Sequence, residues 1–205
     1  MRLVLVRHGA SQANLAGLVT GTPNDMLSPA GIEQARQASM QFAPLLQPQA
    51  CYTSQWRRAQ QTAEMVFPSL SFRVDPRLGE TDAGDVADSK LTDFLQDQPD
   101  FYTSHLNAYP GGESHQQLYE RVTSWLDDAR QQHNGLVLAV CHAGPIACLM
   151  HHALGISMER FPCLMAQHTS LSIIDYAEGD NEAPRLQVFS QLPDVRLSKL
   201  MEPTA

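Results

Sequence analysis

The sequence predicts an α/β fold in which helices cover both faces of a doubly wound, mostly parallel sheet. Short apolar runs alternate with longer segments in which apolar residues recur at helical spacing, and this alternation is typical of such sheets. Several runs are continuously apolar, as expected for strands that are covered on both sides. The chain has 205 residues, of which 43% are hydrophobic, so it can bury one substantial core. We therefore expect a three-layer αβα arrangement that forms a single domain over residues 1–205.

Six segments have the apolar pattern of strands. They are Leu3–Val6, Ala50–Thr53, Ser71–Val74, Leu136–Cys141, Ser170–Asp175 and Arg185–Phe189. Helical patterns fill most of the intervening stretches. A chain that alternates in this way is expected to place most of its strands side by side in the same direction.

Helix boundaries are marked by capping residues and by proline or glycine. The first long helix is expected to begin at Ser28, which can act as the N-cap, with Pro29 in the first turn, and to run toward Leu46. A second helical pattern stops at Pro68, and a third stops shortly before Gly135. These two helices are predicted over Gln55–Phe67 and Ser114–Gln132.

Residues 80–112 interrupt the alternation of strands and helices. The segment is acidic, is punctuated by glycine and proline, and is only weakly helical. We expect it to form a small excursion that packs over one edge of the sheet as a cap, rather than a separate domain. Glu113 and Ser114 follow this segment and can start a helix with Ser114 as the N-cap, a structural role that competes with a functional one.

The composition argues against several classes of partner. A net charge of −8 and a pI near 5.4 would repel a polyanion, so nucleic acid is not expected to bind. No apolar stretch approaches the roughly 18 residues of a membrane span, and residues 1–8 do not resemble a signal peptide. We therefore expect a cytoplasmic protein that does not bind membranes. The sequence leaves open whether the chain forms a homodimer.

The cysteines are expected to be reduced and mostly buried thiols. They occur singly, without C-x-x-C pairs or the dense spacing of a disulfide scaffold, and this spacing also predicts no zinc site. They are Cys51, Cys141, Cys148 and Cys163.

Imidazole and guanidinium groups follow three of the expected strands. Arg7 and His8 follow the first strand, Arg57 and Arg58 come shortly after the second, and His142 follows the fourth. Ligands of open α/β sheets bind beyond the carboxyl ends of the strands, so these side chains are expected to converge. Guanidinium groups present a rigid fork of donors that matches phosphate oxygens. The sequence therefore predicts a site for a small phosphate ester.

Six segments carry a resemblance to a known family. They are RHGASQAN at 7–14, MLSPAGIEQA at 26–35, SQWRRAQQTA at 54–63, LGETDAGD at 78–85, PGGES at 110–114 and VLAVCHAG at 137–144. With these segments in this order, the chain from Arg2 to about Asp175 resembles the phosphoglycerate mutase-like members of the histidine phosphatase superfamily. Within that group it is most similar to small phosphatases of the α-ribazole phosphatase type.

The resemblance implies a nucleophilic histidine surrounded by phosphate ligands. It makes His8 the nucleophile that accepts the phosphoryl group, Glu80 the acid that protonates the leaving oxygen, and His142 a further catalytic residue. The side chains that it implies as phosphate ligands are Arg7, Arg58, His142 and Asn14. Neutral imidazole is a competent nucleophile, and these positive groups can stabilise the transition state without a metal or another cofactor. The implied reaction is hydrolysis of a small phosphate ester, with α-ribazole 5′-phosphate as one candidate.

Two positions depart from the family pattern. Val86 and Ala87 stand where relatives commonly carry Trp-Glu, so the pocket wall near Glu80 is expected to differ and to admit water to the phosphohistidine. Access of water favours hydrolysis over transfer to a second hydroxyl. Ser11 stands where relatives often have Glu, and we expect this change to be tolerated.

Three alternatives compete with this interpretation. The first is a cofactor-dependent phosphoglycerate mutase, but relatives of that type are usually longer. The second is a non-catalytic module that binds phosphorylated ligands, which replacement of His8 or Glu80 would have favoured. The third uses Cys51 and Arg57, which have the spacing of cysteine-dependent phosphatases. The residues between them contain no glycine to wrap a phosphate, and Cys51 begins a buried strand.

The remaining histidines lie outside these motifs, and no role is predicted for them. They are His105, His115, His133, His151, His152 and His168. Within the RRA sequence, the family pattern places the phosphate ligand at Arg58 and leaves Arg57 as a solvated or salt-bridged neighbour.

Overall fold

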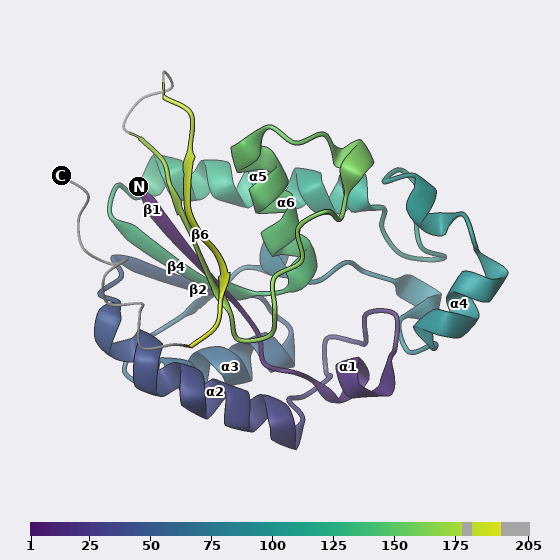
Figure 1. Cartoon of the computed structure of the whole chain (residues 1–205), viewed down its shortest axis with the longest axis horizontal. Coiled ribbons are helices and arrows are strands. Elements are labelled where there is room, and N and C mark those ends of the chain that lie inside the picture. Colours follow the sequence, from purple (N-terminus) through teal and green to yellow (C-terminus); the bar gives the residue numbers. More distant parts are fainter. Residues whose placement is uncertain (178–181, 194–205) are drawn as a thin grey trace.

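The computed structural model describes residues 1–177 and 182–193, so residues 178–181 and 194–205 of the expected domain lie outside the described ranges. Within these ranges a six-stranded sheet lies between helices (Figure 1). Its strands are β1 (Arg2–Arg7), β2 (Ala50–Thr53), β3 (Arg73–Val74), β4 (Leu136–Cys141), β5 (Leu171–Asp175) and β6 (Arg185–Gln191). The α-helices of these ranges are α1 (Gln12–Ala16), α2 (Pro29–Phe42), α3 (Arg57–Val66), α4 (Leu91–Asp97), α5 (His115–Gln132) and α6 (Ala143–Leu154).

The sheet is mostly parallel, as predicted. Its strand order is β3-β2-β4-β1-β5-β6, and the neighbouring strands among β1 to β4 run in the same direction. β5 departs from this pattern because it runs antiparallel to β1, with Val6 opposite Leu171 and Arg2 opposite Asp175. The beginning of β5 therefore lies beside the end of β1, at the same edge of the sheet as the ends of the parallel strands.

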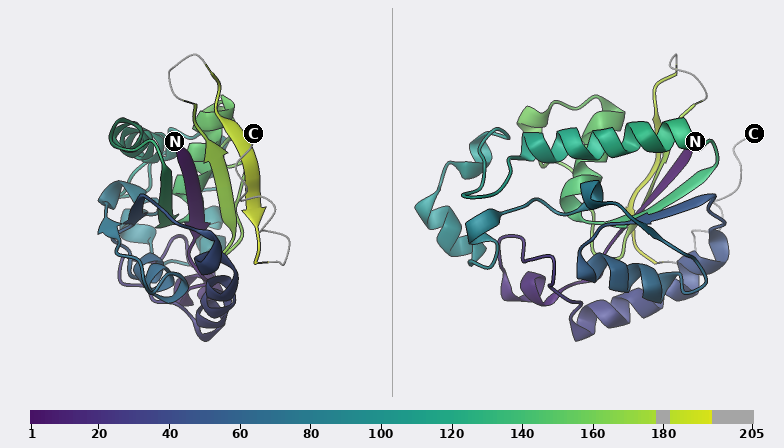
Figure 2. Two further views of the ribbon diagram at one scale, coloured as in Figure 1. Left: turned by 90° about the vertical axis from the view of Figure 1, so that its left-hand side faces the viewer. Right: turned by 180° about the vertical axis from the view of Figure 1, so that it is seen from behind.

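Two apolar clusters fill the space between the sheet and its helices. Successive side chains of a strand point to opposite faces of the sheet. Leu3 and Leu5 of β1 accordingly belong to the cluster with α5 and α6, whereas Val4 and Val6 belong to the cluster with α2 and α3. Figure 2 shows these helix pairs on opposite sides of the sheet. The predicted three-layer αβα arrangement is confirmed.

The start of α2 follows from its sequence. The hydroxyl oxygen of Ser28 accepts a hydrogen bond from the backbone N–H of Gly31 at 3.1 Å, so Ser28 is the predicted N-cap. The α-helix was predicted to run toward Leu46, but it ends at Phe42. A 3₁₀ turn over Ala43–Leu45 follows it.

The segment around β3 is shorter than predicted. α3 begins at Arg57 rather than at Gln55, because Trp56 still has an extended backbone with ψ of 133°. The predicted strand Ser71–Val74 is reduced to Arg73–Val74, which pairs with β2 at only two positions. The residues before it still belong to the loop that leaves α3.

The start of α5 settles the local role of Ser114. Its hydroxyl oxygen accepts from the backbone N–H of Gln117 at 3.2 Å, and the Gln117 side chain accepts from the backbone N–H of Ser114 at 2.8 Å. This reciprocal pair is a capping box, which satisfies two donors at the start of the helix. Ser114 is therefore the N-cap of α5.

Residues 80–112, which we call the cap, have a small apolar cluster of their own. The buried members of this cluster are Ala83, Phe94, Phe101 and Tyr109. Phe94 lies on α4, and its ring centroid is 4.9 Å from that of Phe101. The cap projects from the end of the sheet at which the parallel strands finish (Figure 1).

The two ends of the cap are tied together at one place, which we call the neck. The backbone N–H of Glu113 donates to the carbonyl of Asp82 at 2.8 Å, and the backbone N–H of Asp82 donates to the Glu113 carboxylate at 2.9 Å. Gly84 lies close by with φ of 50°, and a Cβ there would come within 2.3 Å of the Pro110 carbonyl oxygen. The same Glu113 carboxylate pairs with Arg121 of α5 at 2.6 Å, which fixes the neck to the main body.

All four cysteines are free thiols, and three of them are buried, while Cys163 is exposed. Among residues 1–177 and 182–193, no helix has the length and apolar character that crossing a lipid bilayer requires.

Candidate active site

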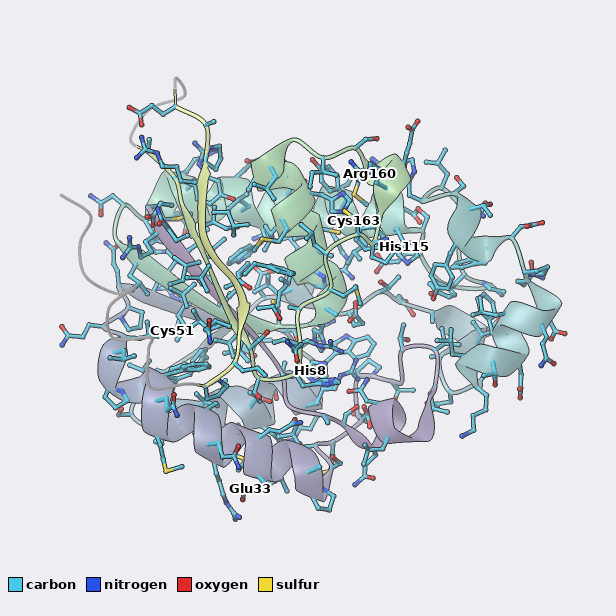
Figure 3. The ribbon with its side chains drawn as sticks, viewed as in Figure 1. His8, Glu33, Cys51, His115, Arg160 and Cys163 are labelled. Atoms are coloured by element: carbon cyan, nitrogen blue, oxygen red, sulfur yellow. The ribbon has the colours of Figure 1, made fainter. Side chains whose placement is uncertain are left out.

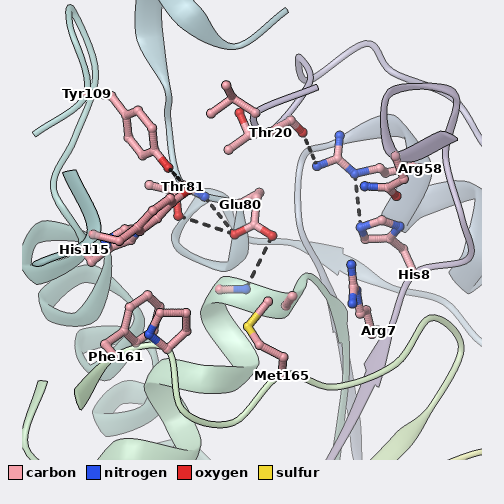
Figure 4. Close-up of a pocket in the computed structure, with 16 residues that line it drawn as sticks. Arg7, His8, Thr20, Arg58, Glu80, Thr81, Tyr109, His115, Phe161 and Met165 are labelled. Carbon is pink, nitrogen blue, oxygen red and sulfur yellow. Dashed lines mark hydrogen bonds between the residues drawn. The ribbon is translucent and has the colours of Figure 1, made fainter. Parts of the chain in front are cut away.

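A cavity of about 170 Å³ lies where β1 and β4 end, beneath the cap. Figure 4 draws the residues that line it. Five of the predicted site residues are among them: Arg7, His8, Asn14, Arg58 and Glu80. The predicted convergence of side chains beyond the carboxyl ends of the strands therefore occurs.

The loop that carries His8 is packed tightly against the start of α2. A Cβ on Gly31 would lie 2.0 Å from the Ala10 carbonyl oxygen, and a Cβ on Gly9 would lie 2.6 Å from the Gly31 carbonyl oxygen. The Ala10 carbonyl also accepts from the Ser28 hydroxyl at 2.8 Å. Only glycine fits at these two positions, so the segments at 7–14 and 26–35 depend on each other.

The ring of His8 is buried and held in one orientation. Its Nδ1 lies 2.6 Å from the Gly9 carbonyl oxygen, which can only accept, so Nδ1 carries the proton and Nε2 is unprotonated. Arg58 Nε donates to this Nε2 at 3.1 Å. Burial, followed by the charges of Arg58 and Arg7, holds the pKa of His8 well below its usual range. The ring is therefore neutral at pH 7.

Arg58 is the most constrained cation of the cavity. Its side chain is only 1% exposed, although it carries a charge. Besides the bond to His8, its Nη1 pairs with Asp25 at 3.2 Å and its Nη2 donates to the Thr20 carbonyl at 3.1 Å. The guanidinium carbon lies 4.4 Å from the centre of the Trp56 ring. These contacts offset the cost of burying the charge and fix its direction.

Arg7 and Asn14 meet at a histidine for which no role was predicted. Arg7 Nη1 donates to the Ala166 carbonyl at 2.6 Å, and its Nη2 lies 3.0 Å from His168 Nε2. The same nitrogen of His168 is 3.0 Å from Asn14 Oδ1. A single ring nitrogen cannot both accept from Arg7 and donate to Asn14, so these two contacts compete.

Asn14 is held by the start of α1. Its Oδ1 accepts from the backbone N–H and the hydroxyl of Ser11, at 3.1 and 3.0 Å, while its own N–H donates to the Ser11 hydroxyl at 3.2 Å. Ser11 is thus the N-cap of a capping box. Ser11 therefore has a structural role of its own at the start of α1.

His142 lies behind His8 rather than among the lining side chains. It is fully buried at the N-cap of α6, and its ring centroid is 4.8 Å from that of His8. Its Nε2 is 2.7 Å from the Ser54 hydroxyl, whereas its Nδ1 is buried without a hydrogen-bond partner among the described residues. Burial, followed by Arg58 and His8, holds the pKa of His142 well below its usual range.

Glu80 approaches the start of α6 very closely. Its two carboxylate oxygens accept from the backbone N–H groups of Thr81 at 2.9 Å and Gly144 at 3.3 Å. A Cβ on Gly144 would lie 2.2 Å from the carboxylate, which explains the glycine in the HAG sequence. Arg121 of α5 holds the backbone of Glu80 in place, because its Nη2 donates to the Glu80 carbonyl at 2.9 Å.

Arg57 and Cys51 are not part of this arrangement. Arg57 is exposed at the start of α3 and contacts Gln60, in agreement with its predicted role as a solvated neighbour. Cys51 is buried in the cluster with α2 and α3, and Figure 3 shows it well away from His8. Burial raises the pKa of the Cys51 thiol, so its reactive thiolate is disfavoured.

Val86 and Ala87 do not line the cavity, so the expectation that they form its wall near Glu80 is wrong. Both pack against the apolar cluster of the cap and are absent from the residues that line the cavity. Tyr102 and Tyr109 line it instead. The reason is that the neck turns the segment after Glu80 outward into the cap.

The structure adds several residues that the sequence motifs did not indicate. His168 lies beside His8, with ring centroids 5.6 Å apart. Burial, followed by Arg7 and Arg58, lowers the pKa of His168 to about 4. His115, at the start of α5, and Phe161 and Met165, in the loop after α6, also line the cavity.

Comparisons with known proteins extend over most of the chain. A family model described as the histidine phosphatase superfamily (branch 1) matches residues 3–188. Human 6-phosphofructo-2-kinase/fructose-2,6-bisphosphatase 4 is 31% identical over 188 residues, which cover 86% of this chain but only 38% of that protein. The adenosylcobalamin/alpha-ribazole phosphatase of Escherichia coli K12 is 32% identical over 172 residues, or 78% of this chain and 82% of that one.

A solved structure has a similar fold. Mycobacterial glucosyl-3-phosphoglycerate phosphatase in complex with VO3 is 26% identical, with a TM-score of 0.83 over 93% of this chain and 99% of that chain. The similarity thus extends over most of the chain. Because the family model also spans nearly all of the described residues, the chain belongs to the histidine phosphatase superfamily, branch 1.

Proposed function

We propose that the protein is a phosphomonoesterase that hydrolyses a small phosphate ester through a phosphohistidine at His8. Residues 1–205 would act as one catalytic domain, with the cap over the site. The observation that carries the proposal is the fixed tautomer of His8. Its proton is committed to the Gly9 carbonyl, so the Nε2 lone pair is available for attack beside Arg58.

The reaction follows in two balanced steps. The Nε2 lone pair of His8 attacks the phosphorus while the bond to the ester oxygen breaks, and Glu80 gives its proton to that oxygen, so that an alcohol leaves. Water then attacks the phosphorus and returns a proton to the Glu80 carboxylate. The N–P bond breaks, inorganic phosphate leaves, and His8 is neutral again. Two easier steps replace one difficult displacement.

The charges around His8 suit a dianion. Arg58 already points a donor at the attacking nitrogen, and Arg7 lines the same cavity. A bound phosphate would replace the contact between Arg58 and His8 and would offer oxygens to Asn14 and to the unpartnered Nδ1 of His142. Preorganised donors of this kind stabilise charge on the transferring phosphoryl group. These placements support phosphate-binding roles for Arg7, Arg58, Asn14 and His142.

The cavity volume and the relatives bear on the substrate. Pockets that enclose drug-sized ligands hold roughly 300–1,000 Å³, so a cavity of about 170 Å³ suits a small ester. The E. coli relative is named an adenosylcobalamin/alpha-ribazole phosphatase, which makes α-ribazole 5′-phosphate the first candidate to assay. The relatives also include a glucosyl-3-phosphoglycerate phosphatase, so the assay should include phosphoglycerates.

The test is a phosphate-release assay over α-ribazole 5′-phosphate, sugar phosphates, nucleotides and phosphoglycerates. A parallel incubation with 3-phosphoglycerate and a catalytic amount of 2,3-bisphosphoglycerate is analysed for both products. Phosphate release without 2-phosphoglycerate supports the hydrolase. Formation of 2-phosphoglycerate faster than free phosphate would establish the mutase alternative. Binding of phosphate esters without any turnover would favour the non-catalytic alternative.

A further inference from the structure

The cavity has two chemically different ends (Figure 4). His8, Arg7 and Arg58 lie together at one end, which we call the phosphate end. The opposite end, which we call the leaving-group end, is formed by aromatic side chains, and Met165 lies at its border with the phosphate end. Glu80 lies between the two ends. An ester whose phosphorus is at His8 and whose leaving oxygen is at Glu80 must therefore extend into the leaving-group end.

The aromatic side chains form a continuous surface, which we call the aromatic wall: Tyr102, Tyr109, His115 and Phe161. The rings of Tyr102 and His115 are stacked, with centroids 5.7 Å apart and planes at 18°. The Phe161 ring centroid is 4.8 Å from that of His115. The hydroxyls of Tyr102 and Tyr109 are 2.9 Å apart and bond to each other. This wall offers flat apolar area together with a few neutral hydrogen-bonding groups.

The leaving-group end contains no permanent positive charge among the described residues that line it. The guanidinium groups of the cavity belong to Arg7 and Arg58, both at the phosphate end. His115 is flanked by Glu80, Glu113 and His105, but burial is the largest effect and lowers its pKa, so the ring is neutral at pH 7. A second anionic group on the substrate would thus lie near Glu80 without a cationic partner among these lining residues.

We propose that the aromatic wall and Met165 select phosphate esters whose leaving group is uncharged and carries a flat ring, and that they reject esters with a second anionic group. This inference rests on the proposed function, because it assumes that the phosphorus lies at His8. Aromatic contacts of this kind contribute to ring binding, whereas an unpaired carboxylate loses its hydration without compensation. Phosphoglycerates, phosphoserine and bisphosphorylated sugars would then be poor substrates, and aryl or arylmethyl esters and nucleoside-like monophosphates would be good ones.

The first experiment compares two matched esters, benzyl phosphate and 4-carboxybenzyl phosphate. Both release a primary benzylic alcohol, so they differ mainly in one charge at the far end of the ring. We expect kcat/KM to be at least about tenfold higher for benzyl phosphate. Equal values, or a preference for the carboxylated ester, would overturn the proposed selectivity.

The failure of this inference can be separated from the failure of the proposed function. Affinities for benzylphosphonate and 4-carboxybenzylphosphonate, measured by calorimetry, report on the cavity without any turnover. Tenfold tighter binding of benzylphosphonate with no hydrolysis of any ester would retain the selectivity and refute the hydrolase. Hydrolysis of both esters at equal rates would refute the selectivity and retain the hydrolase. If neither phosphonate binds and no ester is hydrolysed, both are refuted.

A positive charge placed at the border of the leaving-group end should change the preference between 4-carboxybenzyl phosphate and benzyl phosphate. Met165 lines the cavity and is 51% exposed, so a lysine at this position can keep its ammonium group hydrated. Met165→Lys should raise the ratio of carboxybenzyl to benzyl phosphate activity by about threefold or more, whereas the uncharged Met165→Gln should not. Met40→Lys, on the exposed surface of α2 and away from the cavity lining, adds the same charge and should leave the ratio unchanged. A ratio that rises equally in both lysine variants would contradict the assignment.

The stacked rings of Tyr102 and His115 can be tested with a second variant. Tyr102 is 40% exposed, so its truncation removes little from the core. Tyr102→Ala should lower kcat/KM for benzyl phosphate by about two- to tenfold relative to ethyl phosphate, and Tyr102→Phe should retain most of that preference. Parallel losses on benzyl and ethyl phosphate would show that the ring does not lie against this wall.

Discussion

The phosphate end and the leaving-group end of the cavity are built from different kinds of structure. His8 and Arg58 are each 1% exposed and lie at the end of a strand and in the first turn of a helix. Tyr102 and Met165, by contrast, are 40% and 51% exposed and lie in the cap and in the loop after α6. The chemistry is thus supported by the main core, whereas recognition of the leaving group is supported by peripheral segments. Substitutions at the two ends should therefore differ in kind: at the phosphate end they should affect every ester, and at the other end only some.

The largest effect is expected at the nucleophile. His8→Ala should lower kcat on the order of 10³-fold or more for every ester, because no other group can accept the phosphoryl group in the same place. The circular dichroism spectrum should remain that of a folded protein, since the ring faces the cavity. Cys51→Ser should be nearly silent in the same assay. Substantial activity of His8→Ala, or loss of activity in Cys51→Ser, would revive the cysteine alternative.

Glu80 lies between the two ends, and its substitution should separate esters by their leaving group. Glu80→Gln should slow hydrolysis of benzyl phosphate by about 10²–10⁴-fold, because the departing alkoxide is strongly basic and needs a proton. The loss should be much smaller for p-nitrophenyl phosphate, whose leaving group needs little protonation. Equal losses on the two esters would mean that Glu80 only positions the substrate.

The two neighbouring arginines offer a matched pair. Arg58→Lys keeps the charge but cannot bond His8, Asp25 and Thr20 together, so kcat/KM should fall by about 10²-fold. Arg57→Lys makes the same exchange one residue away on the exposed surface and should remain within about twofold of the original protein. Similar losses in both variants would argue that the effect is general to α3 rather than specific to the cavity.

The smallest expected effect concerns stability at acidic pH. The pKa of His168 is lowered to about 4 by burial and by Arg7 and Arg58. The unfolded chain takes up this proton near pH 6.5, whereas the folded chain does so only near pH 4. The contribution of His168 to the free energy of unfolding is therefore largest above pH 6.5 and falls as the pH drops toward 4. The slope from this group is at most about 1.4 kcal/mol per pH unit, and solvent screening reduces it because the ring is partly exposed.

His168→Asn removes this titration while retaining a polar side chain. Thermal unfolding between pH 7 and pH 4.5 should show a smaller decrease of Tm in the variant than in the original protein. Parallel curves for the two proteins would contradict the assigned pKa. Added inorganic phosphate provides a further check, because a dianion bound near His168 should favour its protonated form and should stabilise the protein.

The sequence motifs predicted the phosphate end better than the leaving-group end, for a physical reason. His8, Arg58 and Glu80 lie in short segments whose local structure already directs them to the edge of a parallel sheet. His168 has no such local signal. It precedes β5, and it reaches the cavity only because β5 runs antiparallel to β1, which brings the start of one strand beside the end of the other. A correct direction for β5 would have indicated His168.

The leaving-group end depends on contacts between distant segments. His115 was correctly predicted to lie at the start of a helix, but its stacking with Tyr102 depends on how the cap folds back from the neck. The error at Val86 and Ala87 has the same origin. Proximity to Glu80 in the sequence suggested proximity in space, whereas the neck directs these residues into the apolar cluster of the cap.

Because of the neck, the cap can be replaced as a unit. The segment enters at Asp82 and leaves at Glu113, these two residues are joined by two hydrogen bonds, and the cap buries its own apolar side chains. Its internal sequence can therefore diverge, or be swapped for that of a relative at the same two points, without change to the strands or α3, provided that Ala87, Ser89 and Leu91 keep their backbone hydrogen bonds to residues 17–21. A family whose members share this neck can acquire new substrates when about thirty residues change. The residues that transfer the phosphoryl group are kept throughout.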